Sequence, residues 1–179
     1  MKQINWFFLV AGTFVMIYVM SVTGKSLKTP ATPLGILNLE LAYNSSKINT
    51  VLIAWSGSGE NETNRISAAK KNTWLDFIFI FFYALFLFYS CITISDSFTG
   101  LTRSLGRFFA AGALNAGLLD IAENAGMLMT LNGFSSNSIA LLTAICSAIK
   151  WSLALAALFY VLFLGPLYLL RKMNNRNHP

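Results

Sequence analysis

Residues 74–94 read WLDFIFIFFYALFLFYSCITI, an apolar run with a single charged residue, Asp76. An α-helix rises 1.5 Å per residue, so about 20 apolar residues are enough to cross the roughly 30 Å hydrocarbon core of a bilayer. The run therefore predicts a helix that spans a membrane.

Three further apolar runs lie at residues 6–22, 106–131 and 139–170. The first follows Lys2 and could be a cleaved signal peptide, but it lacks an A-x-A site and is longer than a usual signal core, which favours a retained helix. The last run exceeds the length of a span, so we expect this helix to tilt, project or bend near Pro166. The sequence predicts an all-α fold, a four-transmembrane-helix bundle that forms one domain over residues 1–179.

The composition supports an integral membrane protein. Of the 179 residues 55% are hydrophobic and 11% charged, 15 are Phe, and the mean hydropathy is +0.59. An average soluble domain has about 25% charged residues, so a soluble globular protein, a disordered chain and a disulfide scaffold are excluded. The net charge of +6 is typical of cytoplasmic flanks and lipid headgroup contact rather than of nucleic-acid binding.

The sequence lacks the residues that several kinds of metal site and catalytic site require. The only histidine is His178, and the two cysteines, Cys91 and Cys146, lie in separate apolar runs. Bis-His haem ligation, a His-based di-iron site, a Ser–His protease and a cysteine metal site are therefore excluded. No nucleotide-binding glycine motif is present. We expect no cofactor and no metal site, and the sequence leaves enzymatic activity undecided while favouring a non-enzyme.

The distribution of basic residues predicts the orientation. An even number of spans places both termini on one side. Arg171 and Lys172 follow the last span, Arg103 and Arg107 lie in the short second loop, and the third loop, residues 132–138, is uncharged. The positive-inside rule then predicts a cytoplasmic (inner) membrane protein with both termini in the cytoplasm. Six Lys and Arg in the first loop argue the other way, but long loops count less.

The first loop, about residues 23–73, is extracytoplasmic in this orientation and should contain short helices. Thr32-Pro33 reads as a helix start before LGILNLELAY, residues 34–43, and KINTVLIAW, residues 47–55, is a second apolar segment. Neither can span the bilayer, so we expect both at the mouth of the bundle or in the interface. Trp55 and Trp74 are expected to act as anchors at the level of the headgroups.

Charged residues inside the third and fourth spans are the most informative feature. A charge at bilayer depth costs about 3 kcal/mol on insertion scales. Asp120 lies 11 residues before the end of its run at Leu131, and Lys150 lies 11 residues after the start of its run at Ile139. Both are therefore about 16 Å from the outer surface, so antiparallel neighbours would bring them level. Glu123 shares the helix face of Asp120 by its i,i+3 spacing.

Further polar residues share these faces. Asn124 follows Asp120 on one stripe, Ser147 precedes Lys150 on another, and Asp76 and Tyr83 are seven residues apart on the second span. The candidate ligand- or ion-binding residues are Asp76, Tyr83, Asp120, Glu123, Asn124, Ser147 and Lys150. They predict a polar core in the outer half of the bundle.

Two interpretations of this core remain open. The pair of Asp120 and Lys150 could be purely structural and set helix register. The carboxyls of Asp76, Asp120 and Glu123 nevertheless outnumber the single ammonium and leave a formal charge of −2. Protonation, water, a cation or a basic ligand would balance this excess.

Four segments and one tryptophan carry a resemblance to known sequences: TPLGILNLELA (residues 32–42), WLDFIFIFFYAL (74–85), LLDIAENAGML (118–128), IKW (149–151) and Trp55. Together they resemble an uncharacterised family of small four-helix bacterial integral membrane proteins. The resemblance covers nearly the whole chain and implies no activity. It singles out the polar core and adds two candidates in the first loop, Glu40 and Trp55.

The leading hypothesis is a polar cavity, open toward the outer side, that binds or moves a small ligand, a proton or a cation. Four helices are few for a monomeric transporter, so a homo-oligomer or partner membrane subunits are expected, and no nucleic acid. The first alternative is an accessory or assembly subunit of a larger membrane complex with a structural buried ion pair. The second is a lipid-modifying membrane enzyme that uses a carboxyl with Lys150, for which no nucleophile is evident.

Overall fold

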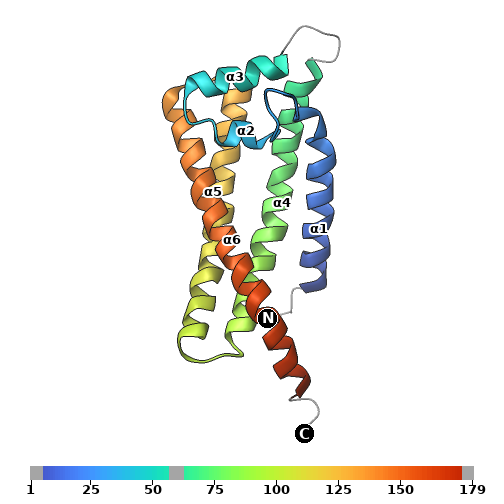
Figure 1. Cartoon of the computed structure of the whole chain (residues 1–179), viewed down its shortest axis with the longest axis vertical. Helices are drawn as coiled ribbons and strands as arrows, with labels where there is room; N and C mark the ends of the chain where they lie inside the picture. Colours follow the sequence, from blue (N-terminus) through green and yellow to red (C-terminus); the bar gives the residue numbers. More distant parts are fainter. Residues whose placement is uncertain (1–5, 57–62, 175–179) are drawn as a thin grey trace.

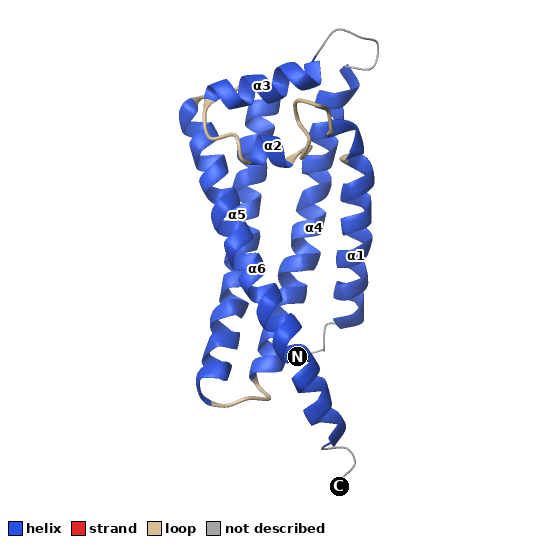
Figure 2. Ribbon diagram, viewed as in Figure 1, coloured by secondary structure: helices blue, strands red, loops and turns tan. Residues whose placement is uncertain are grey.

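The computed structural model describes residues 6–56 and 63–174, and in that part of the chain every regular element is a helix (Figure 2). The order is α1 (Trp6–Thr23), the 3-10 turn η1 (Lys25–Leu27), α2 (Leu37–Glu40), α3 (Ser45–Ser56), α4 (Thr63–Ser95), α5 (Gly100–Leu131) and α6 (Asn137–Asn174). The four long helices, α1, α4, α5 and α6, are long and apolar enough to cross a membrane. The predicted all-α bundle with short helices in its first loop is confirmed.

Helix α4 is the central element of the bundle. It packs against α1 on one side and against α5 and α6 on the other, and α5 also packs along α6. The first turn of α1 and the last turns of α6 lie at one end of the bundle, and α6 projects beyond it (Figure 1). The opposite end is covered by η1, α2 and α3. We call residues 25–56 the cap and this end the capped end.

The long helices extend beyond the apolar runs that predicted them. α4 begins at Thr63 instead of residue 74, and α5 begins at Gly100 instead of residue 106. The added turns contain Lys and Arg, which are good helix formers although they are not apolar. Hydropathy finds the part of a helix that crosses the hydrocarbon and misses its polar extensions.

The first short helix of the cap is smaller than expected. The sequence predicts a helix over residues 34–43, and the structure has α2 only over Leu37–Glu40. Gly35 adopts a φ of 64°, a left-handed conformation that an α-helix does not contain. Thr32 does not cap the helix; its hydroxyl instead donates to the carbonyl of Leu27 at 2.9 Å. The predicted start at Thr32-Pro33 is therefore wrong.

Trp55 is the centre of the cap rather than an interfacial anchor. Its side chain is fully buried, and Nε1 donates to the Leu27 carbonyl at 3.0 Å and to Thr32 Oγ1 at 3.2 Å. Ile48, Val51 and Trp55 lie on one face of α3 and pack with residues of α5 and α6. The predicted anchor is wrong for Trp55 because this face of α3 turns inward. Trp74 is 63% exposed near the capped end, where an interfacial anchor would lie.

A short connection sets the alignment of α5 and α6. Gly133, at φ 91°, follows the end of α5, and the Ser136 hydroxyl accepts the backbone N–H of Ile139 in the first turn of α6. Asn137 Oδ1 also accepts the backbone N–H of Ser45, which ties the start of α3 to the start of α6. The two long helices are thus antiparallel neighbours, and the end of α5 lies level with the start of α6 at the capped end.

Candidate functional site

Helices α5 and α6 bring three charged side chains together below the cap. Lys150 Nζ lies 2.6 Å from Asp120 Oδ1 and 2.9 Å from each carboxylate oxygen of Glu123. All three side chains are buried, and Glu123 has no exposed surface. The level positions that the sequence predicts from depth are confirmed by this geometry.

Helix α4 contributes two further polar groups. The Tyr83 hydroxyl donates to Asp120 Oδ2 at 2.8 Å, so both carboxylate oxygens of Asp120 are engaged. Asn124 Nδ2 donates to Asp76 Oδ2 at 2.7 Å. The seven-residue spacing of Asp76 and Tyr83 places both on the face of α4 that meets α5.

The cap reaches into the bundle through Glu40. This residue belongs to α2, is buried, and places Oε2 3.7 Å from Lys150 Nζ. The same oxygen accepts from Ser147 Oγ and Trp151 Nε1, both at 3.4 Å. Residues far apart in the sequence therefore meet at one ammonium, and we call Glu40, Asp76, Asp120, Glu123 and Lys150 the charged cluster.

The charged cluster is strongly unbalanced. It holds four of the seven acidic residues of the chain and one of its 13 basic residues, so its formal charge is −3. Lys150 is the only Lys or Arg that forms an ion pair with these carboxyls among the described residues. The sequence predicts an excess of two negative charges; Glu40 raises it to three.

One buried acceptor in the site also lacks a partner. Asn124 is fully buried, and its Oδ1 accepts no hydrogen bond within the described part of the chain. Asp76 can only accept when ionised, so the Asn124 amide must turn its nitrogen toward Asp76, and Oδ1 is left beside that carboxylate. An unsatisfied buried acceptor costs about 1–3 kcal/mol. The site therefore contains a buried acceptor oxygen that none of its own donors satisfies.

The structure separates the two candidates that the resemblance added. Glu40 belongs to the charged cluster, whereas Trp55 lies in the core of the cap and holds its backbone in place. Ser147, Asn124 and Tyr83 all bond to cluster carboxylates. Sequence reasoning missed Trp151, although its position directly after Lys150 near the level of the polar core was a usable signal.

The chemistry available in the site follows from the groups that converge there. Among the described residues, no group of three or more His, Cys, Asp or Glu is arranged to hold a metal ion. The groups that converge are carboxylates, one ammonium, one phenol, an amide and an indole. They can bind positive charge and N–H or O–H donors.

Comparisons with known proteins assign no family or function to the chain. The resemblance to a bacterial four-helix family stays a prediction. No protein-family model matches the chain, and neither a curated protein nor a solved structure is significantly similar to it.

Proposed function

We propose that the protein is an integral membrane protein that binds a small cation or cationic ligand at the charged cluster. The observation that carries the proposal is the charge count. Three carboxyls lie within 3.7 Å of one ammonium, a fourth carboxyl, that of Asp76, is bonded to Asn124 beside them, and the site is largely removed from water. Burying a charge without a partner is costly, so the excess needs compensation. A bound cation supplies it.

A purely structural role would need fewer groups. One carboxyl opposite Lys150 is enough to align α5 with α6, and Asp120 already provides it with both oxygens engaged. Three further carboxyls add negative charge that is not needed to align α5 with α6: those of Glu123, Glu40 and Asp76. This surplus supports ligand binding over a simple buried ion pair.

The proposal includes a membrane and an orientation. We place the protein in the cytoplasmic membrane of a bacterium with both termini inside, so that the capped end faces outward. The basic residues at the opposite end, with Arg103 and Arg107 beside Asp96, and the uncharged α5–α6 connection support this orientation. If the protein moves its ligand, four helices require a homo-oligomer or partner subunits to form a path.

The test is cation-dependent thermal unfolding of the purified protein in phosphatidylcholine nanodiscs. Sodium, potassium, ammonium and methylammonium are each titrated at constant ionic strength against N-methyl-D-glucamine, a bulky organic cation that serves as the reference. A ligand that binds only the folded state raises the Tm, and the rise becomes logarithmic in ligand concentration above the dissociation constant. We expect this behaviour for at least one of the four.

Two variants localise the effect. Glu123→Gln removes a buried carboxyl of the cluster and should abolish the cation-specific shift. Asp96→Asn is the matched control: its carboxyl is 54% exposed at the far end of the bundle, so the shift should persist. The proposal fails if no cation raises the Tm above its value in N-methyl-D-glucamine, or if both variants respond like the wild type.

A second candidate function, an accessory subunit, is favoured by one feature of the cap. Leu34, Leu41 and Tyr43 are about half exposed, and a cavity of about 230 Å³ lies between α2 and α3. Such a surface would suit a partner protein. Purification in mild detergent separates the two functions, because a subunit would co-purify with one defined partner at fixed stoichiometry.

A further inference from the structure

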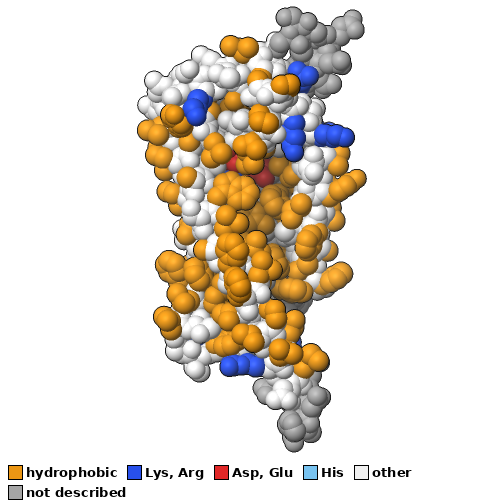
Figure 3. Space-filling model, viewed as in Figure 1, with side chains coloured by type: hydrophobic (Ala, Val, Ile, Leu, Met, Phe, Trp, Pro, Cys, Tyr) orange, Lys and Arg blue, Asp and Glu red, His pale blue; other side chains and the backbone are white. Residues whose placement is uncertain are grey.

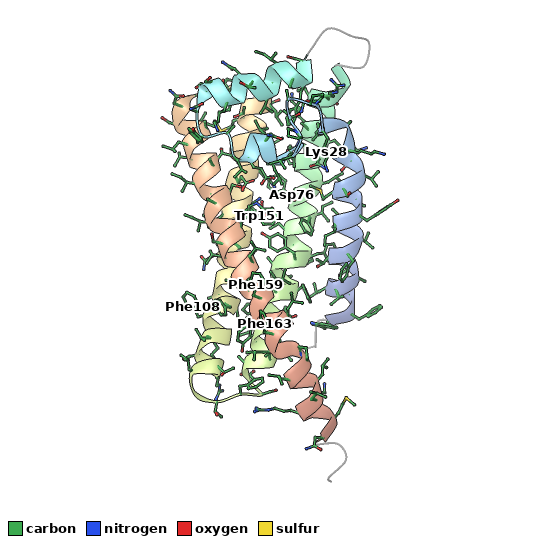
Figure 4. The ribbon with its side chains drawn as sticks, in the orientation of Figure 1. Lys28, Asp76, Phe108, Trp151, Phe159 and Phe163 are labelled. Atoms are coloured by element: carbon green, nitrogen blue, oxygen red, sulfur yellow. The ribbon has the colours of Figure 1, made fainter. Side chains whose placement is uncertain are left out.

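The charged cluster is accessible from the side of the bundle. Asp76 is its only member that is partly exposed; the other four are buried. α1 packs on α4, α6 packs on α4 and α5, and α1 and α6 share no extensive contact. Figure 3 shows acidic atoms on the face between α1 and α6, directly below α2 and framed by hydrophobic side chains. In Figure 4 the labelled Asp76 of α4 and Trp151 of α6 both lie on this face.

The depth and surroundings of this opening match an amphipathic ligand. Asp76 follows Lys71 by five residues, or about 7.5 Å along the helix, and follows the exposed Trp74 by two. It therefore lies close below the level where headgroups meet acyl chains. Trp151 is 44% exposed beside it, and Phe159 and Phe163 are exposed farther along the same face (Figure 4). The polar part of the opening, at Asp76, therefore lies at the depth of a lipid headgroup. The apolar part, along α6, lies at the depth of the acyl chains.

The unsatisfied atoms of the site specify the polar group. Asp76 presents carboxylate oxygens, and Asn124 Oδ1 is a fully buried acceptor without a partner beside Asp76. A primary ammonium carries one positive charge and three N–H donors, so it can neutralise a carboxylate and satisfy the amide oxygen together. A quaternary ammonium has the same charge and no donor.

We infer that this opening binds the primary ammonium group of an amphipathic molecule that enters from the lipid between α1 and α6, with its apolar part along α6. The inference rests on the proposed function, since it names the chemical class of the cation. Lys28 lies above Asp76 on the rim of the same face (Figure 4), where it suits a phosphate next to the ammonium. The ammonium can therefore come from an ethanolamine headgroup or from a free long-chain amine.

A ligand series on the wild-type protein tests the inference without any substitution. The Tm in phosphatidylcholine nanodiscs is measured against octylamine, octyltrimethylammonium and octanol, which differ only in the polar group. We expect octylamine to raise the Tm with the logarithmic concentration dependence of a specific ligand, and an apparent affinity at least about tenfold weaker for the other two. Equal responses to octylamine and octyltrimethylammonium, or none to octylamine, would overturn the inference.

Variants and lipids complete the test. Asp76→Asn should weaken octylamine binding by about tenfold or more, whereas Asp96→Asn should leave it unchanged. Nanodiscs that contain phosphatidylethanolamine identify the source: displacement of octylamine by this lipid assigns the site to a headgroup, and octylamine binding without displacement assigns it to a free amine. If a small cation binds through Glu123 while octylamine does not bind, the proposed function stands and this inference fails.

Discussion

Lys150 connects α5, α6 and the cap through a single nitrogen atom. Its contacts to Asp120 and Glu123 are short, while Glu40 lies farther away at 3.7 Å. The first two contacts follow from depth along two antiparallel helices, which sequence spacing determines. The position of Glu40 could not be predicted from spacing, because α2 has four residues and its place depends on the packing around Trp55.

A double-mutant cycle measures how far Asp120 and Lys150 depend on each other. Lys150→Met leaves the buried carboxyls without their cation, so we expect it to lower the free energy of unfolding by about 3–5 kcal/mol. Asp120→Asn should cost less, since Glu123 and Glu40 still face the ammonium and Tyr83 can donate to the new amide oxygen. The double variant should lose less than the sum of the two, by about 0.5–3 kcal/mol. Denaturation in mild detergent gives the four values, and strict additivity would contradict the observed contact.

At the scale of helices, the apolar runs predicted the existence of all four spans, and polar helix formers hid their full length. Close packing between helices depends on small residues. Ala110, Ala113, Ala116 and Gly117 are buried on α5, where they let α4 and α6 approach. The sequence does not predict which glycine is in tight contact, because that depends on the side chains opposite.

Two glycines of α5, Gly106 and Gly112, allow a matched test of how tightly the helix packs at each position. A Cβ at Gly106 would collide with Tyr160 and with Ser95 Cβ, and Tyr160 is held by its hydrogen bond to the Thr102 carbonyl. We expect Gly106→Ala to lower the free energy of unfolding by about 1–3 kcal/mol. At Gly112 the nearest atom, Leu153 Cδ2, is 3.6 Å away, so Gly112→Ala should be neutral or stabilise by up to about 1 kcal/mol. Equal effects of both substitutions in a thermal unfolding experiment would mean that α5 packs differently.

At the scale of the whole molecule, the two ends differ in what they expose. The capped end carries α3, and the opposite end carries the α4–α5 connection and the last turns of α6 (Figure 1). If both termini are cytoplasmic, a cysteine at the exposed Ser46 of α3 should react with an impermeant thiol reagent in intact cells. A cysteine at the exposed Ser104 near the start of α5 should react only after lysis. The wild type, with Cys91 buried and Cys146 partly buried, is the background control, and the reverse pattern would overturn the orientation.

We propose that the charged cluster holds a positively charged ligand, and a high-resolution electron cryomicroscopy structure of the protein in native lipid is the decisive experiment. Such a structure shows what faces Asn124 Oδ1 and the Asp76 carboxylate. We expect non-protein density within hydrogen-bond distance of both groups, continuous with density along α6 if the ligand is amphipathic. A dry cluster in which a protein donor satisfies Asn124 Oδ1, with no added density near Asp76, would contradict it.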